Sequence, residues 1–199
     1  MFECQHQPLV VPPSVAADLA ARYSEPHRAY HTLSHIAAML AWFDSLAWTD
    51  PASVYLAILF HDAIYDPLAK DNEARSADLA RSLVSASPRV CDLILLTSRH
   101  GSLSPADVSD DLDAAHFLDV DTSILGASPA AFDAYDAGVA FEYSVVPPAA
   151  YLAGRRAFLS NLLSRPRIFL SSHFHALLDA PARANLRRAL ARLSTSATS

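Results

Sequence analysis

Histidine and aspartate residues in two neighbouring segments have the types and the spacing that metal or acid–base chemistry requires. His31 and His35 lie four residues apart in "YHTLSHIAAML", and His61 and Asp62 directly follow the apolar run "VYLAILF". On a helix, a spacing of four places two side chains on one face, about 5–6 Å apart at Cβ. Imidazole nitrogens and carboxylate oxygens are common ligands of divalent cations. This pattern predicts either a shared metal ion or one metal ligand beside one general acid.

Two more carboxylates lie in the otherwise apolar segment "HFLDVDTSILG", at Asp119 and Asp121. A buried carboxylate without a partner costs free energy, so each of them needs a counter-charge or a hydrogen-bond donor. Residues i and i+2 of a helix point in different directions, so both cannot easily face the same site. The spacing alone leaves either aspartate as a candidate ligand.

Each of these residues also has an ordinary structural interpretation. A histidine at the end of a helix can interact with the helix dipole, and an aspartate there can be solvated. The zinc-protease pattern HExxH is excluded, because Thr32 stands where that motif has its glutamate. Cys4 and Cys91 are too few for a disulfide framework and form no CxxC pair. The clustering of histidines and acids beside apolar segments is what favours a site.

The composition is that of a chain that can form one domain with a substantial core. The sequence has 199 residues, of which 52% are hydrophobic, and its formal net charge of -6 disfavours general binding to nucleic acids. The longest apolar stretch, Val54 to Phe60, is far too short to cross a bilayer. The first ten residues lack the pattern of a secretory signal. We therefore expect a cytoplasmic protein without a membrane partner, and a homo-oligomer stays open.

The periodicity predicts an all-α fold. Apolar residues recur at intervals of three and four, and only four glycines occur. Asp50, Ser87 and Ser128 each precede a proline, which is typical of an N-cap followed by proline at the first helical position. We expect helices over 13–23, 31–47, 51–64, 71–86, 88–98, 111–124, 129–145, 148–164 and 181–193.

These helices are expected to form a single domain. The predicted boundaries are an N-terminal extension over 1–12, a helical domain over 13–193 and a disordered polar tail over 194–199. Outside the expected helices, His173 and His175 in "SSHFHALL" are interpreted as loop or partner-binding residues.

The ordered set of motifs resembles the HD superfamily of metal-dependent phosphohydrolases. The strings that carry the resemblance are "EPHRAYHTLSHIAAML", "FHDAIYD", "DNEARSA", "FLDVDTSILG", "FEYSVV", "YLAGRR" and "ARANLRR", and they extend from about Tyr23 to Leu193. They look like a predicted phosphohydrolase group of about this length within that superfamily. The resemblance implies a single-domain, HD-type helical bundle.

The resemblance also implies roles for particular residues. It maps the metal ligands onto His35, His61, Asp62 and Asp121, with Asp119 as the alternative to Asp121. Asp121 is preferred over Asp119 because "VDTSILG" looks like the string that carries the last ligand in cyclic-nucleotide phosphodiesterases and guanosine-tetraphosphate hydrolases. "YHTLSH" is similar to the phosphodiesterase "YHNxxH", which implies that His31 is the general acid. Asp62 would thus serve catalysis as well as metal binding.

A site of two imidazoles and two carboxylates suits Mn, Mg, Fe, Ni, Co or Zn. The cation would activate a water for attack on a phosphate ester of a nucleotide or of another small phosphorylated metabolite. We expect positively charged side chains near the motifs, and one histidine, to contact the phosphate. These residues are Arg28, Lys70, Arg99 and His100. Asp66 and Glu73 are candidates for a base, for binding a water beside the ligands, or for capping the helix that follows.

Two alternatives stay open. Some HD-fold proteins are di-iron oxygenases, which require two further imidazoles between the HD pair and the last aspartate. His100 fits the later of these positions as a second-metal ligand, whereas Asp71, Asn72 and Glu73 stand where the earlier imidazole is expected. The other alternative is a non-catalytic module that keeps the fold and binds a nucleotide or a partner.

Overall fold

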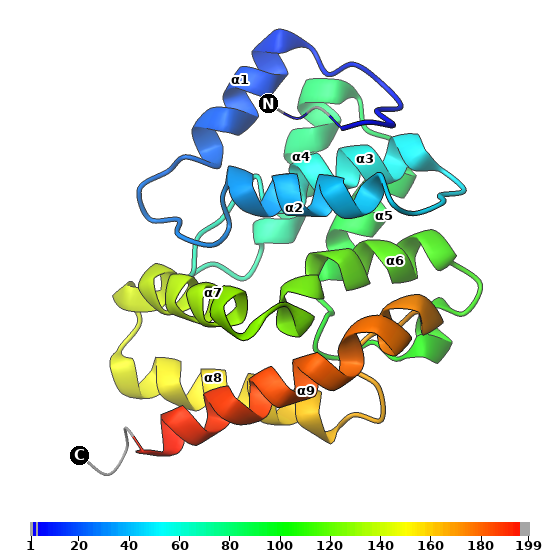
Figure 1. Ribbon diagram of the computed structural model, residues 1–199. Coiled ribbons are helices and arrows are strands. Elements are labelled where there is room, and N and C mark those ends of the chain that lie inside the picture. Colours follow the sequence, from blue (N-terminus) through cyan, green and yellow to red (C-terminus); the bar gives the residue numbers. More distant parts are fainter. Residues whose placement is uncertain (1, 3, 196–199) are drawn as a thin grey trace.

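The computed structural model describes residues 2 and 4–195, and over these residues it contains helices and no strand (Figure 1). The all-α prediction is confirmed. The α-helices are α1 (Pro13–Arg22), α2 (Leu33–Phe43), α3 (Pro51–Phe60), α4 (Asn72–Val84), α5 (Pro88–Thr97), α6 (Leu112–Asp121), α7 (Pro129–Glu142), α8 (Pro148–Ser164) and α9 (Ser172–Thr195). Short 3-10 helices are η1 (Pro105–Val108), η2 (Ser123–Gly126) and η3 (Tyr143–Val145).

Three helices begin as the N-cap and proline pattern predicts. The side chain of Asp50 accepts a hydrogen bond from the backbone N–H of Ser53, 3.0 Å away, at the start of α3. Ser87 and Ser128 make the same kind of cap at the starts of α5 and α7. Each cap gives a partner to an N–H that the first helical turn leaves unpaired.

Helix α3 is the centre of the N-terminal half. Its residues from Ala57 to Phe60 are fully buried, and it packs against α2, α4, α5 and α6. Burial on all sides explains why this segment reads as a continuous apolar run without a polar stripe. Because α3 packs against helices on all sides, its C-terminal end has a fixed position. His61 follows directly after this end. In Figure 1, α6 and α7 lie at the middle level of the view, below α2 and α3 and above α8 and α9.

Helix α2 begins later than predicted, which changes the interpretation of His31. The hydroxyl of Thr32 caps the helix by accepting from the N–H of Ser34, and the helix begins at Leu33. His31 therefore lies in the turn before α2, and the prediction that it shares a helical face with His35 is wrong. The two rings are still close, with centroids 6.0 Å apart. The cause is tertiary, since a carboxylate from α7 holds the backbone of this turn.

Helix α9 begins at Ser172, nine residues before the predicted start at Pro181. A proline inside a helix lacks the N–H that would bond to the carbonyl four residues earlier, at a cost of about 3 kcal/mol. Packing offsets that cost. Phe174 in the first turn is fully buried against Trp42 and Phe169, and a buried phenylalanine contributes about 1.5–3 kcal/mol.

The longer helix corrects the interpretation of two histidines. His173 and His175 lie in the first turns of α9 rather than in a loop. His175 is 3.2 Å from the carboxylate of Asp179, one turn further along the helix.

The described part of the N-terminal extension packs onto the core. Phe2 is buried, and its carbonyl accepts a hydrogen bond from the hydroxyl of Tyr55 at 2.6 Å. The N–H groups of Gln5 and His6 donate to the carboxylate of Asp44 just after α2. In the predicted tail, Ser194 and Thr195 belong to α9, and residues 196–199 lie outside the described residues. Among the described helices, none combines the length and apolarity needed to cross a membrane.

Replacing Phe174 by alanine tests how α9 is anchored. The change leaves a cavity at a fully buried position, so the free energy of unfolding should fall by about 3–5 kcal/mol. Leu177→Ala is the matched control, because Leu177 is 50% exposed on the same helix and should change stability by no more than about 0.5 kcal/mol. Urea denaturation of both variants measures the difference. Equal effects would contradict the docking of this turn.

Candidate metal centre

Four predicted ligands come together at the meeting point of three helices. His35 lies on α2, His61 caps the C-terminus of α3 with Asp62 beside it, and Asp121 is the last residue of α6. One ligand atom from each of them lies within 4.8 Å of all the others. The residues of this group lie as far as 86 positions apart in the sequence, from His35 to Asp121.

The separations between these atoms fit a single cation. The Nε2 atom of His35 is 3.3 Å from Nε2 of His61 and 3.1 Å from Oδ1 of Asp121. The Nε2 atom of His61 is 3.0 Å from the nearer carboxylate oxygen of Asp62. Ligands about 2.1 Å from one cation lie roughly 3.0 Å apart at octahedral angles and roughly 3.4 Å apart at tetrahedral angles. The cluster therefore has the dimensions of a mononuclear site.

The orientation of His61 is fixed by its own helix. Its Nδ1 atom lies 3.0 Å from the carbonyl oxygen of Ile58. A carbonyl can only accept, so Nδ1 carries a proton, and Nε2 is the nitrogen directed at the cluster, where its lone pair would bind a metal ion. A hydrogen bond of this kind sets the tautomer of metal-binding histidines.

The two carboxylates of the cluster need positive charge beside them. Burial alone would lower the pKa of His61, but the charges of Asp62 and Asp121 outweigh it and raise that pKa well above its usual range. Burial likewise tends to raise the pKa of Asp121, yet His61 and His100 hold it well below its ordinary value. Two carboxylates side by side thus depend on a neighbouring cation, which a divalent metal ion would supply.

Asp119 lies outside this cluster. Its carboxylate oxygens accept hydrogen bonds from the N–H groups of Leu170 and Ser171, each at 2.7 Å. It is buried and ties the segment before α9 to α6. Of the two aspartates that the sequence left as alternatives, Asp121 is the one directed toward the two imidazoles.

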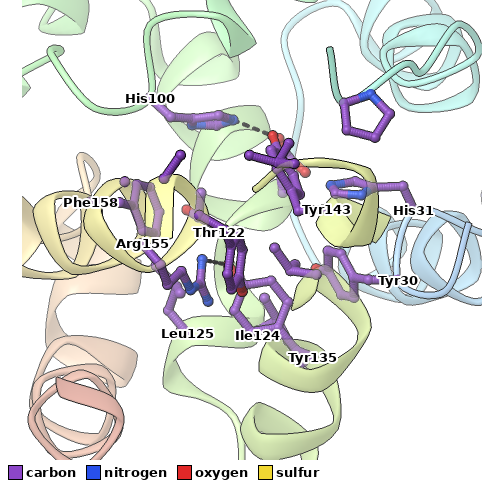
Figure 2. Close-up of a pocket in the computed structure, with 17 residues that line it drawn as sticks. Tyr30, His31, His100, Thr122, Ile124, Leu125, Tyr135, Tyr143, Arg155 and Phe158 are labelled. Carbon is purple, nitrogen blue, oxygen red and sulfur yellow. Dashed lines mark hydrogen bonds and ion pairs between the residues drawn. The ribbon is translucent and has the colours of Figure 1, made fainter. Parts of the chain in front are cut away.

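His100 contacts the cluster through Asp121. Its Nε2 atom donates to Oδ2 of Asp121 at 2.6 Å, while Oδ1 of the same carboxylate faces His35 and His61. The dashed line from His100 in Figure 2 marks this bond. His100 thus orients a candidate ligand in this structure, and it is not a member of the four-residue group that could hold a metal ion.

A buried carboxylate that sequence reasoning missed holds His31 in place. Glu142, at the end of α7, accepts hydrogen bonds from the N–H groups of Ala29, Tyr30 and His31 and from Nδ1 of the His31 ring at 2.7 Å. With its proton on Nδ1 committed to Glu142, the ring directs Nε2 toward Asp62, whose carboxylate is 4.0 Å away. The hydroxyl of Tyr65 also donates to Glu142.

These contacts shift the pKa values of both partners. Burial would raise the pKa of Glu142, but the hydrogen bonds and charge of His31 lower it to about 2. Burial would lower the pKa of His31, but Asp62 and Glu142 outweigh it and raise that pKa. His31 is therefore disposed to carry a proton beside the cluster.

Arg28 has a structural role instead of the predicted contact with phosphate. Its guanidinium is fully buried and donates to the carbonyl oxygens of His31, Asp62 and Ala63. It also forms an ion pair with Glu25. The side chain therefore fastens the turn that carries His31 to the turn that carries Asp62.

The other predicted residues lie away from the cluster. The carboxylate of Asp66 accepts from the N–H of Leu68 and stabilises a turn. Glu73 is half-buried in the first turn of α4, and Lys70 and Arg99 are exposed. None of these four residues lines the cavity that His31, His100 and Asp121 border.

That cavity has a volume of about 600 Å³, and of the four candidate ligands Asp121 lies in its wall. Figure 2 shows the side chains that line it. His31, His100 and Asp121 form part of its wall, and most of the rest is aromatic or aliphatic. Tyr135, Tyr143, Tyr151 and Arg155 line this cavity. The sequence signals for Glu142 are its place in the string "FEYSVV" and its position as an acid inside the apolar stretch "GVAFEYSVV".

Comparison with protein-family models, with curated proteins and with solved structures finds no match to this chain. The geometry of the cluster and of the cavity therefore carries the functional assignment.

Substituting the two neighbouring aspartates separates the ligand role from the structural role. At a metal concentration 100 times the dissociation constant, the free energy of unfolding of the unsubstituted protein should rise by about 2.7 kcal/mol. Asp119→Asn should lower stability without metal by about 1.5–3 kcal/mol and keep this gain. Asp121→Asn should lose most of the gain. Denaturant titrations with and without Mn²⁺ measure both effects, and a retained gain in Asp121→Asn would exclude it as a ligand.

Glu142→Gln tests the buried acid through its pH dependence. The pKa of Glu142 falls from 4.5 to about 2 on folding, so its stabilisation is complete above the unfolded value and is lost as the pH falls toward the folded value. The stability difference between the unsubstituted protein and Glu142→Gln should be roughly 3 kcal/mol at pH 6 and should shrink steadily between pH 5 and pH 2. Urea titrations across this range measure it. A difference that does not change with pH would contradict the assignment.

Proposed function

We propose that the protein is a metal-dependent phosphohydrolase of the HD type, which cleaves a phosphate ester of a nucleotide or of another small phosphorylated metabolite. The observation that carries the proposal is the convergence of His35, His61, Asp62 and Asp121 on one point. Asp121 also lies in the wall of a cavity of about 600 Å³. The resemblance of the sequence motifs to the HD superfamily supports the same function.

The donor set fits a divalent cation, since two imidazoles and two carboxylates form a site of intermediate hardness. When bound there, such an ion would lower the pKa of a coordinated water and stabilise charge on the phosphoryl oxygens. Four protein ligands leave coordination positions open for water and phosphate on a six-coordinate ion. The neighbouring cavity gives space for the rest of the substrate.

His31 is the proposed general acid. The Nδ1 atom of His31 donates to Oε2 of Glu142, 2.7 Å away. The proton available for transfer is therefore the one on Nε2, which faces Asp62. A leaving oxygen within hydrogen-bond distance of Nε2 would receive that proton as its bond to phosphorus breaks. Arg28 and Glu142 support this step by fixing the backbone of the turn that carries His31.

The alternative functions have less support from the geometry. A di-iron oxygenase requires six protein ligands, whereas the metal-binding group found among the described residues contains four. A module that only binds a nucleotide needs no oriented proton donor, which the pair of His31 and Glu142 provides.

Activity after loss of a ligand tests the proposal directly. The purified chain with Mn²⁺, Mg²⁺, Co²⁺ or Ni²⁺ should release phosphate or a nucleoside from at least one member of a panel of phosphate esters, and Asp62→Ala should abolish that release. The backbone carbonyl of Asp62 still accepts from Arg28 in this variant, so circular dichroism should show a folded protein. Undiminished turnover by a folded Asp62→Ala protein would overturn the proposal.

The leaving group of the substrate tests the role of His31. Removing a general acid costs about 10²-fold to 10⁴-fold in kcat when the departing alkoxide needs a proton. His31→Gln should therefore impair hydrolysis of an alkyl phosphate by about that factor, and hydrolysis of p-nitrophenyl phosphate, whose leaving group needs no proton, much less. Steady-state kinetics on the two esters give the ratio. The same loss on both would assign His31 another role.

A further inference from the structure

The wall of the cavity beside the ligand cluster is unusually rich in aromatic rings. The rings come from the turn before α2, from α7, from η3 and from α8, and they belong to Tyr30, Tyr135, Tyr143, Tyr151 and Phe158. Ile124, Leu125 and Val139 add aliphatic surface. In Figure 2, His100 and His31 lie toward the top of the view, whereas Ile124, Leu125 and Tyr135 lie toward the bottom. The cavity thus has a polar end at the cluster and an apolar remainder.

The arginine in the cavity wall is already engaged in hydrogen bonds with other side chains. Among the described residues that line it, Arg155 is the sole arginine or lysine. Its Nε and Nη2 atoms donate to one carboxylate oxygen of Asp136 at 3.0 and 2.8 Å, and its Nη1 atom donates to the hydroxyl of Tyr135. Only 7% of its side chain is exposed. The guanidinium therefore lacks the open fork that bidentate phosphate binding uses.

The remaining ionisable groups of the wall do not replace it. His31 donates to Glu142 and His100 donates to Asp121, so each imidazole has one nitrogen already engaged by a carboxylate. Asp121 contributes negative charge to the same wall. Arg28, which the sequence offered as a phosphate ligand, is fully buried on backbone carbonyls. A chain of further phosphates would therefore meet the negative charge of Asp121 and find no arginine or lysine free to bind it.

We propose that the substrate carries a single phosphate on an uncharged group that contains an aromatic ring, a description that nucleoside monophosphates and aryl phosphates share. This inference rests on the proposed function, because it places the phosphate at the ligand cluster. The aromatic group then stacks on the rings of the cavity wall. Substrates with a polyphosphate chain are rejected because the cavity has no uncommitted arginine or lysine to bind the additional phosphates, and small polar esters are poor because they leave the rings uncovered.

The test compares three probes on the Mn²⁺-loaded chain: adenosine 5′-monophosphate, adenosine 5′-triphosphate and glycerol phosphate. Loss of one base–aromatic stacking contact corresponds to about 5-fold to 150-fold in affinity. The monophosphate should therefore exceed both other probes in kcat/KM by at least about 10-fold. A triphosphate or glycerol phosphate that reacts as well as the monophosphate would overturn the inference and leave the proposed function intact.

Variants assign the preference to the cavity wall. Phe158→Ala should reduce the ratio of kcat/KM for the monophosphate over glycerol phosphate by about 5-fold to 150-fold. Phe141→Ala is the control, because Phe141 is 55% exposed and lies outside the cavity, and it should leave the ratio unchanged. If Phe158→Ala does not fold, Tyr143→Ala tests the half-buried ring of η3 in the same way. An unchanged ratio in the folded variant would contradict the stacking role.

Direct binding distinguishes failure of the inference from failure of the function. If none of the probes is hydrolysed, isothermal titration of the Mn²⁺-loaded chain with the same probes still measures the preference. Binding of the monophosphate at least about 10-fold tighter than the other two supports the inference while the hydrolase proposal fails. Equal binding of all three, or binding of none, overturns the inference.

Discussion

The central constraint in this structure is the placement of two carboxylates and two imidazoles within 4.8 Å of one another at the edge of the core. Carboxylates so close together repel each other, and their surroundings solvate them poorly. The arrangement is favourable only with positive charge among them, supplied by protonated imidazoles or by a metal ion. A fold that maintains it must hold each ligand against that repulsion.

Hydrogen bonds and packing around the cluster hold the ligands in place against this repulsion. Burial of α3 on all sides fixes His61, whose ring is then oriented by the carbonyl of Ile58. His100 holds one oxygen of Asp121 and leaves the other for the cluster. Arg28 and Glu142 do the same for the turn with His31, and Glu142 reaches it from 111 residues away along the chain. Satisfied polar groups beyond the ligands keep the geometry in place.

Much of the fold could be predicted from the sequence because its signals are local. The helical period, the prolines and the capping residues placed most helices within a few residues. The predictions failed where tertiary contacts decide. Packing of Phe174 carries α9 through Pro181, and the carboxylate of Glu142 keeps His31 out of α2. No pattern within a short window contains those partners.

The candidate site was predictable in its ligands and not in its surroundings. His35, His61 and Asp62 have recognisable spacing, but Asp119 and Asp121 differ only in the direction of a helix face, which depends on how α6 packs. Arg28 is an arginine near the motifs, and only the structure shows its guanidinium on backbone carbonyls. The aromatic cavity wall comes from four separate segments, so each ring alone looks like core.

A crystal structure of the chain grown with Mn²⁺ and measured for anomalous scattering tests the central claim most directly. The account predicts one strong anomalous peak about 2.0–2.3 Å from the Nε2 atoms of His35 and His61 and from carboxylate oxygens of Asp62 and Asp121. An absence of signal at this point, or a peak that Asp119 coordinates in place of Asp121, would contradict it.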